Sequence, residues 1–391
     1  MIFPADDILI DRPKPTPLYA ACAAMSEANV WTSINGYAAA RLYSSLEGEY
    51  RAAKEGAAMA DFGPLSRYAV RGENAALLLS RVATAPAATL SPGESARGLI
   101  LDDDGGVMDF AEVARLTDDL FLLTTPSPQA RRVQLAARGL DAKVETISRV
   151  VAAIGVLGPS SGDALMASGM KLPGDHVAAS AVMRGVETAA RPVQFGAVPG
   201  IELIFPAEDA LTIWERLTRR AKVKPIGVDA MEILRIESGA PRPGADFRNS
   251  ASRLDAARAS PEEIGLPHLA PLDSGWFTGR RALRFAPPPP RDRLIALSVD
   301  ADRVLPGAAV FDGGRAIGRI TTAAWSPAAR RVLAFASIQA ASYGKTRELT
   351  VSGESSATLP ARPLETPENE LAKTFLESRD AATEKTRPRV S

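Results

Sequence analysis

Two carboxylates stand among apolar residues in the stretch 98–116, which reads GLILDDDGGVMDFAEVARL. They belong to Asp109 and Glu112. A carboxylate in apolar surroundings destabilises the fold unless it is paired or used. In a site, such a group accepts hydrogen bonds from a ligand or moves a proton during a reaction. The alternative is that both residues lie at an exposed strand edge, because most charged residues lie at the surface.

A third carboxylate, Glu202, lies in the apolar segment GIELIFP, residues 200–206. An unpaired carboxylate in such a strand would be equally costly. Periodicity alone does not separate this interpretation from an exposed strand position, so both remain open for Glu202.

The stretch 98–116 has the pattern of a β-hairpin. Residues 99–101 form a short apolar strand, residues 103–106 a turn with two glycines, and residues 107–116 the return strand. Glycine permits the positive φ that tight hairpin turns require. Because side chains alternate along a strand, Asp109 points to one face, whereas Phe110 and Glu112 point to the other.

The composition excludes several classes of protein. The 391 residues suffice for two or three domains, and Lys+Arg balances Asp+Glu at 46 each, so neither nucleic acid nor an anionic membrane is expected as a partner. Cys22 is the single cysteine, and His176 and His268 are the only histidines, so no metal site is expected. The apolar runs are too short to span a bilayer, and the first residues lack the pattern of a secretory signal, which predicts a cytoplasmic protein.

The mixture of hairpins and helices predicts an α+β fold rather than a doubly wound parallel sheet. The sequence has neither the glycine pattern of a nicotinamide or flavin site nor that of a P-loop. The run Pro287–Pro290 is typical of a domain boundary, and the short strands beyond it predict a small all-β barrel. Residues 361–391 are charged and are expected to be partly disordered.

Six segments carry a resemblance to a known family: EYRAAKEGAAMADFGPLSRYAVRG (49–72), LDDDGGVMDFAEVARL (101–116), IGVLGPSS (154–161), PGIELIFP (199–206), GVDAMEILRIESG (227–239) and SPEEIGL…DSGWFTGRRAL (260–283). In this order they resemble the aminomethyltransferase superfamily, which includes the glycine cleavage T-protein and tetrahydrofolate-dependent demethylases. The resemblance covers roughly residues 16–355.

The resemblance implies a three-domain cloverleaf, with two α+β lobes around a central hole for folate and a C-terminal all-β barrel. The first lobe would be discontinuous, with residues 1–58 and 148–286. The second lobe would comprise residues 59–147, and the barrel residues 291–360.

The resemblance also implies tetrahydrofolate as the cofactor. Glu202 lies where the family has the carboxylate that holds the pterin, and Phe195 lies where it usually has a Tyr that lines the pterin pocket. Phe110, Thr124 and Trp276 complete the predicted cofactor-binding set. No metal ion is implied.

The hairpin departs from the family pattern at the catalytic position. The transferases usually have two consecutive Asp here and use the second, whereas this chain has Asp109 followed by Phe110. Asp109 cannot replace the missing residue directly, because it points to the opposite face. We hypothesise that Glu112, about 6.5 Å further along the strand, supplies a displaced carboxylate. Asp109 and Glu112 are therefore the candidate catalytic residues, and a solvated Glu112 is the alternative.

Three other family features are altered, and the missing Asp and Arg together argue against the usual aminomethyl transfer. The segment Asp61–Leu65 lacks the family's His, and Met231 replaces an Arg associated with the folate tail. The segment 195–197 reads Phe-Gly-Ala in place of Tyr-Thr-Gly.

The resemblance, together with these departures, implies a tetrahydrofolate-dependent methyltransferase or demethylase that acts on a small methylated N-, S- or O-donor. Two alternatives remain: a non-catalytic folate-binding or regulatory protein, and the folate-binding subunit of a larger oxidase. The expected partners are the small methylated substrate and either a second copy of the chain or an oxidase partner subunit.

Overall fold

The structure is a computed structural model that describes residues 13–170, 179–195, 198–249, 258–273, 275–285, 289–344, 348–353 and 358–366. Several features discussed above lie outside the described residues: the first twelve residues, His176, Gly196, Ala197, Pro287, Pro288 and most of the charged tail. Among the described residues, no helix is both long and apolar enough to cross a membrane.

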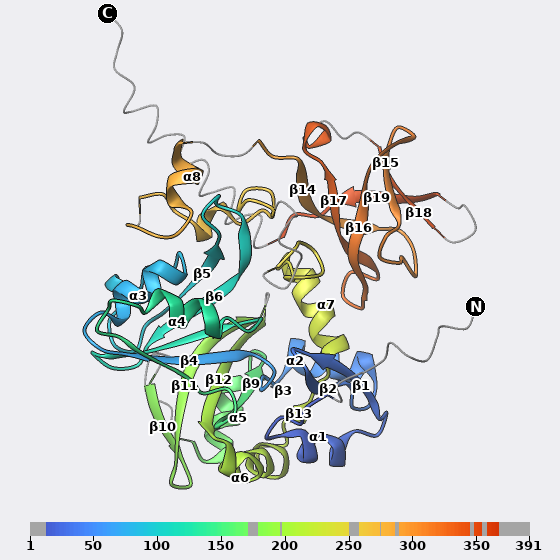
Figure 1. The fold of residues 1–391 in the computed structure, drawn as a ribbon. Helices are drawn as coiled ribbons and strands as arrows, with labels where there is room; N and C mark the ends of the chain where they lie inside the picture. Colours follow the sequence, from blue (N-terminus) through green and yellow to red (C-terminus); the bar gives the residue numbers. More distant parts are fainter. Residues whose placement is uncertain are drawn as a thin grey trace, which may run out of the picture.

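The described residues form two open sheets, a β-ribbon and a closed barrel, together with helices (Figure 1). This arrangement confirms the predicted α+β class with a C-terminal all-β barrel. The first sheet has six strands in the order β10-β11-β12-β9-β3-β13, and the second has five in the order β5-β6-β7-β4-β8. The ribbon pairs β1 with β2, and the barrel closes in the order β14-β17-β16-β15-β18-β19.

The strands have the following bounds: β1 (Val30–Ile34), β2 (Tyr37–Leu42), β3 (Ala58–Asp61), β4 (Ser66–Arg71), β5 (Ser95–Leu101), β6 (Val107–Arg115), β7 (Leu120–Thr125), β8 (Lys143–Thr146), β9 (Val151–Leu157), β10 (Ala179–Met183), β11 (Val186–Phe195), β12 (Val198–Pro206), β13 (Lys224–Pro225), β14 (Asp292–Val299), β15 (Ala309–Asp312), β16 (Arg315–Ser326), β17 (Arg331–Gln339), β18 (Leu349–Ser352) and β19 (Thr358–Pro363). The α-helices are α1 (Tyr19–Met25), α2 (Leu46–Glu55), α3 (Ala75–Val82), α4 (Ala130–Ala136), α5 (Ser161–Ser168), α6 (Ala210–Glu215), α7 (Val228–Ser238) and α8 (Arg280–Phe285).

The first sheet is covered on both faces. One face packs against α1, α5 and α6 in an apolar cluster that includes Leu203, Phe205 and Trp214. The other face contributes to a cluster with α2, α7 and residues of the second sheet, among them Ala114 and Leu122. The two open sheets therefore meet face to face, which brings β6 and β7 against the first sheet. We call each open sheet with its covering helices a lobe, and the six-stranded sheet belongs to the first lobe.

The second sheet contains the predicted hairpin. Its strands β5 and β6 pair antiparallel, with Leu99 opposite Phe110 and a register shift beside Ile100. Helices α3 and α4 cover the face that carries Ile100, Ala111 and Val113. The turn uses Gly105 at a φ of +83°, and a Cβ there would lie 2.7 Å from Leu283 of α8. Glycine is required at this turn for both reasons.

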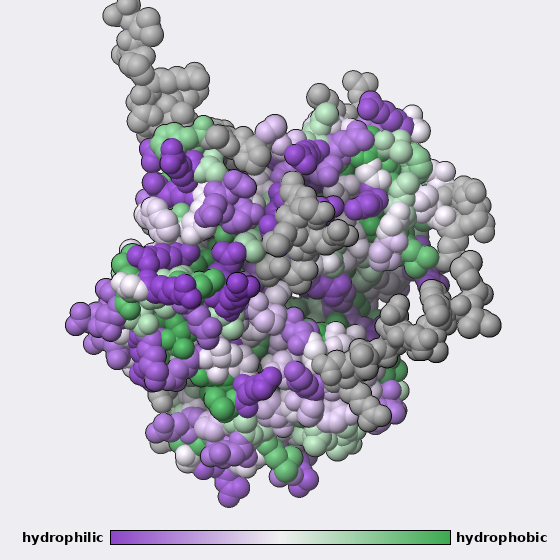
Figure 2. Space-filling model, viewed as in Figure 1, coloured by the Kyte–Doolittle hydropathy of each residue, from purple (hydrophilic) through white to green (hydrophobic). Residues whose placement is uncertain are grey.

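Hydrophilic residues cover much of the lobe that holds α3 and α4 on the face shown in Figure 2. Apolar residues appear on that face in small separate patches. The large apolar clusters are buried where the sheets meet their helices and each other.

Candidate functional site

A cavity of about 1460 Å³ lies between the lobes. Its walls come from the β1–β2 turn, β5, β6, the ends of β11 and β12, the first turn of α5, and α7 with residues 240–243. Phe110, Glu112 and Phe195 are among the lining residues. The space is large enough for a ligand of cofactor size, since ligand pockets usually have volumes of roughly 300–1000 Å³.

Glu112 belongs to a row of polar residues across the second sheet. It pairs in register with Arg97 of β5 on one side and with Thr124 of β7 on the other. Thr124 in turn lies opposite Arg67 of β4. Directly opposed residues in antiparallel strands share a face, so all four side chains project from one side of the sheet. That side faces the first lobe.

The first sheet presents a matching pair, Arg191 of β11 and Glu202 of β12, which are also directly opposite each other. Arg67 Nη2 lies 2.5 Å from Glu202 Oε1, and Arg191 Nη2 pairs with Glu202 Oε2. Through its other terminal nitrogen, Arg191 pairs with Glu112 Oε1. The two sheets are thus joined by a chain of four alternating charges, Glu112–Arg191–Glu202–Arg67, which we call the charge chain.

The inner end of the charge chain is anchored to the backbone. Arg67 Nη1 donates to the carbonyl oxygens of Phe62 at 2.9 Å and Leu65 at 3.2 Å. Glu202 is 0% exposed and Arg67 is 1% exposed, whereas the side chain of Glu112 is 28% exposed. The chain of charges therefore runs from a buried anchor to the wall of the cavity.

Charge balance explains how these groups tolerate burial. Burial on its own would raise the pKa of Glu202, but the charges and hydrogen bonds of Arg191 and Arg67 outweigh it and hold that pKa below its usual value. Burial on its own would lower the pKa of Arg191, whereas Glu112 and Glu202 raise it overall. The two arginines and the two carboxylates pair with one another, which buried charged groups require.

Asp109 occupies the opposite face of β6 and does not line the cavity. It is 0% exposed and accepts hydrogen bonds from the backbone N–H groups of Phe110 and Ser127 and from the side chain of Gln129, at 2.9–3.0 Å. Burial raises its pKa, although these donors partly oppose the effect. Through the bonds from Ser127 and Gln129, Asp109 fixes the segment that follows β7. Pro126 and Ser127 of this segment line the cavity.

Two aromatic contacts shape the cavity wall. The ring of Phe110 meets Phe247 edge to face, with 5.7 Å between ring centroids. The ring of Phe195 lies 6.3 Å from that of Phe62. Aromatic pairs at such distances and tilts are favourable, so both cavity-facing rings are held from behind.

Two family descriptions match the sequence. The GCVT N-terminal domain matches residues 17–259, and the glycine cleavage T-protein C-terminal barrel domain matches residues 293–368. The first match alone spans more than half of the chain. The chain belongs to the glycine cleavage T-protein family.

Individual relatives agree with this family assignment. A "Probable aminomethyltransferase" of Haloarcula marismortui is 30% identical over 328 residues, which cover 80% of this chain and 87% of that protein. The aminomethyltransferase of Streptomyces coelicolor is 29% identical over 323 residues, or 76% of this chain and 82% of its own length. The crystal structure of the glycine cleavage system aminomethyltransferase T from Bartonella henselae has a TM-score of 0.78 at 20% identity, covering 91% of this chain and 98% of its own. The resemblance to the family is therefore confirmed, and the family is one of folate-dependent aminomethyltransferases.

Only some of the residues expected from the T-protein family pattern line the cavity. Phe110, Glu112 and Phe195 line the cavity. Thr124 lies beside Glu112 in the cross-strand row, and its buried hydroxyl has no hydrogen-bond partner among the described residues. Trp276 is 60% exposed and lies outside the cavity lining.

Glu202 and Asp109 are buried, so neither lies at an exposed strand edge. Both belong to interior strands of their sheets, β12 and β6. Glu202 does not line the cavity either. Its position in an apolar strand is explained by the two arginines that pair with it.

Sequence reasoning missed Arg67 and Arg191. A usable signal existed, because both arginines stand in strand-like segments, SRYAV and AARPV, with apolar neighbours. A cation in such a strand needs an anion as much as Glu202 needs a cation. Which cation meets which anion could not be deduced without the stacking of the two sheets.

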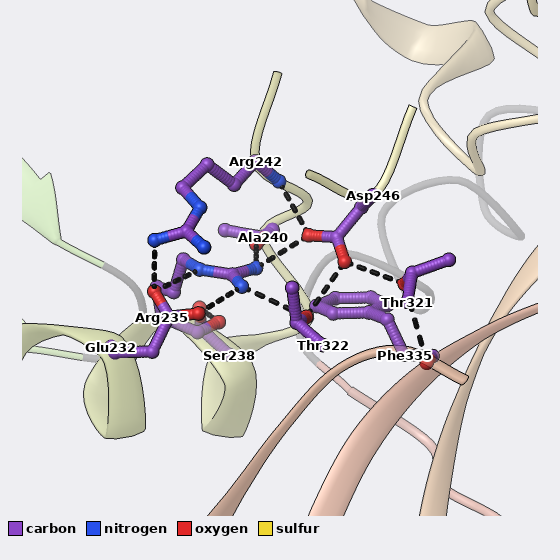
Figure 3. A network of polar contacts seen from close by, with 9 residues as sticks. All are labelled: Glu232, Arg235, Ser238, Ala240, Arg242, Asp246, Thr321, Thr322 and Phe335. Carbon is purple, nitrogen blue, oxygen red and sulfur yellow. Dashed lines mark hydrogen bonds and ion pairs between the residues drawn. The ribbon is translucent and has the colours of Figure 1, made fainter. Parts of the chain in front are cut away.

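A second polar network joins the cavity to the barrel of this T-protein relative (Figure 3). Arg235 of α7 lines the cavity and pairs with Asp246 at 2.8 Å and with Glu232 at 2.5 Å. The hydroxyls of Thr321 and Thr322 on β16 each donate to Asp246 at 2.7 Å. The buried carboxylate of Asp246 thereby ties the end of the first lobe to the barrel.

Arg242 stands at the outer edge of the same network. Its side chain is 46% exposed, lines the cavity and pairs with Glu232 at 3.1 Å. Met231, which replaces the family's tail-associated Arg, also lines the cavity. The cavity therefore combines a carboxylate at Glu112 with an accessible cation at Arg242.

Proposed function

We propose that this protein is a tetrahydrofolate-dependent one-carbon transferase that removes a methyl group from a small methylated N-, S- or O-donor. The observation that carries the proposal is the cavity between the lobes, with the rings of Phe110 and Phe195 and the carboxylate of Glu112 on its wall. Family membership supports the same conclusion.

The lining residues fit a reduced folate. The aromatic side chains suit the flat pterin, and a carboxylate oxygen accepts a hydrogen bond from a polar N–H group of an aminopyrimidine edge. Arg242 offers a cation for the carboxylates at the other end of the molecule. Tetrahydrofolate, when bound, supplies the nitrogen that takes up the one-carbon unit.

The chain's own contribution is mainly to orient and enclose the reactants. Holding two reactants in a near-attack geometry accelerates a transfer strongly without any further chemistry. Phe110 gives the cavity an aromatic wall where the usual transferases present an acid, which suits a donor with apolar or aromatic surface. Glu112 is the carboxylate of the hairpin that can exchange hydrogen bonds or a proton with a bound ligand.

The test is an anaerobic titration with tetrahydrofolate, followed by the fluorescence of the four tryptophans. The protein is then incubated with tetrahydrofolate and a panel of methylated amines, sulfonium compounds and methyl ethers, and 5-methyltetrahydrofolate is measured. Saturable binding together with product formation from one donor class supports the proposal. If tetrahydrofolate does not bind, the proposal is wrong.

A second candidate function is folate binding without catalysis. Phe110 at the position of the usual catalytic Asp favours it. Binding of tetrahydrofolate without turnover of any donor would select this second function over the first.

A further inference from the structure

We propose that Arg97 binds a carboxylate of the methylated donor, so that this protein prefers donors that carry an acid group. The inference rests on the proposed function, because it concerns the second reactant that shares the cavity with tetrahydrofolate. It narrows the donor from any small methylated N-, S- or O-compound to one that also has a carboxylate. Arg97 thereby determines specificity and takes no part in the bond changes of the transfer.

Arg97 lies on the cavity wall at the edge of the second sheet. It belongs to β5, which is the outermost strand of that sheet, and its exposed side chain lines the cavity. The register places it directly opposite Glu112 of β6. Directly opposed side chains share one face of an antiparallel pair, so Arg97 and Glu112 project to the same side of the sheet.

The same face brings Arg97 near Phe110. Phe110 lies opposite Leu99, which is two residues after Arg97 on β5. Arg97 and Phe110 are therefore diagonal neighbours, and such pairs in antiparallel sheets lie about 7–8 Å apart. Position 110 is where the usual transferases of the family have their catalytic acid. A donor at this point can pack its apolar part against the ring and direct an acid group to the guanidinium.

Arginine is well suited to bind a carboxylate. Its planar guanidinium offers two parallel N–H donors that match the two oxygens of an acid group. The four groups of the charge chain pair with one another, so their pairing does not need Arg97. A carboxylate that binds at Arg97 therefore leaves these buried ion pairs intact.

Tetrahydrofolate carries carboxylates of its own, but the geometry favours the donor at Arg97. In folate, the aminobenzoyl group separates the glutamate from the reacting nitrogen, so the tail carboxylates lie far from the point of transfer. Arg97 lies beside that point, next to Phe110 and Glu112. Arg242 lines the cavity beyond the end of α7 with a side chain that is 46% exposed, and it remains the cation for the tail.

The first experiment compares acid donors with their neutral amides by calorimetric titration without tetrahydrofolate. The acids are anisate, dimethylglycine and (methylthio)acetate, each paired with its primary amide, so that each donor atom is represented. In at least one pair, the wild type should bind the acid about tenfold more tightly than the amide, because a hydrogen bond between charged groups is gained. Arg97→Met should remove this preference and leave the affinity for the amide unchanged. Equal affinity for acid and amide in every pair, or a preference that survives in Arg97→Met, would overturn the inference.

Two further variants separate recognition of the carboxylate from a general disturbance. Arg97→Lys keeps the charge and should retain part of the preference, because lysine lacks the forked donors of arginine. Arg281→Met removes an exposed arginine of α8 outside the cavity lining and should behave as the wild type does. A loss of preference in Arg281→Met as large as that in Arg97→Met would show that the preference does not depend on Arg97. Because Arg97 is exposed, the urea midpoint of Arg97→Met should stay close to that of the wild type.

Tetrahydrofolate affinity distinguishes the donor carboxylate from the tail carboxylates. Arg97→Met should leave the affinity for tetrahydrofolate nearly unchanged, whereas Arg242→Met should weaken it and keep the preference for acid donors. If Arg97→Met weakens tetrahydrofolate binding and keeps the preference for acid donors, Arg97 serves the tail and the inference is wrong.

These measurements also separate the inference from the proposed function. A wild type that does not bind tetrahydrofolate but prefers acids through Arg97 would refute the proposed function and leave the carboxylate site standing. Formation of 5-methyltetrahydrofolate from the neutral amides as fast as from the acids would support the proposed function and overturn the inference.

Discussion

Glu112 and Glu202, on strands of two different sheets, are held by one guanidinium, that of Arg191. The pairing joins the lobes at the cavity wall, and Arg67 completes the charge balance from the buried side. The charge that Glu112 presents to the cavity therefore depends on Arg191, which does not itself line the cavity.

Glu202→Gln should destabilise the protein by about 3–5 kcal/mol, because removal of one partner leaves buried charges uncompensated. The charge-balanced variant Arg67→Met/Glu202→Gln should lose clearly less, since it leaves no surplus charge. Urea unfolding followed by circular dichroism measures both. A single variant as stable as the double variant would show that solvent reaches these arginines.

The charge chain should also give the protein a specific loss of stability in acid. The pKa of Glu202 is lowered in the folded state, so the unfolded chain binds more protons between that lowered pKa and the unfolded value of about 4.3. The stabilisation by Glu202 is therefore complete above about pH 4.3 and is lost as the pH falls through the folded pKa. The free energy of unfolding of the wild type, minus that of Arg67→Met/Glu202→Gln, should shrink over this range. A constant difference would contradict the lowered pKa.

Gly155→Ala should disturb the cavity from behind. A Cβ at Gly155 would lie 2.4 Å from the ring of Phe62, which in turn contacts Phe195. We expect a loss of about 1–3 kcal/mol from overpacking, together with weaker ligand binding as the rings shift. The control for stability alone is Gly162→Ala in α5, which lines the cavity but where a Cβ would meet nothing within 4 Å, so stability should be unchanged or rise by up to about 1 kcal/mol. Thermal unfolding compares the two variants, and equal stability would be the contrary result. Calorimetric titration of Gly155→Ala against the wild type measures the loss of binding.

Phe110→Leu should weaken tetrahydrofolate binding by about 2- to 12-fold, because it removes an aromatic face worth roughly 0.5–1.5 kcal/mol while it keeps an apolar side chain. Calorimetric titration measures the tetrahydrofolate affinity of each variant. Phe285→Leu is the matched control, since Phe285 is 75% exposed and lies outside the cavity lining. Equal tetrahydrofolate affinities of the two variants would show that the ring of Phe110 takes no part in binding.

Asp246→Asn should loosen the contact between the first lobe and the barrel. Asp246 is buried, pairs with Arg235 and accepts hydrogen bonds from two threonines of β16. Breaking this pair should destabilise the protein by about 3–5 kcal/mol and speed hydrogen exchange in α7 and β16. Arg242→Ala, at the exposed edge of the same network, should cost less than about 1 kcal/mol. Slow exchange in α7 after the Asp246 change would argue against this role.

The sequence determined the features that depend on local pattern. Alternation along a strand placed Phe110 and Glu112 on one face of the hairpin and Asp109 on the other, and the structure has this arrangement. The resemblance to the family pointed to Glu202, and the cost of a carboxylate in an apolar strand indicated that it is paired or used. Short strands beyond the proline run indicated the C-terminal barrel.

Tertiary structure alone decided which charges meet. Arg67 and Glu202 are 135 residues apart in the sequence, and Glu112 and Arg191 are 79 apart. Their pairing depends on how two twisted sheets stack, which no local pattern encodes. A buried carboxylate signals a need for a partner, but the identity of that partner is a property of the packed interior. For this reason the sequence singled out Asp109, Glu112 and Glu202 as candidates, whereas the structure showed that Glu112 lines the cavity.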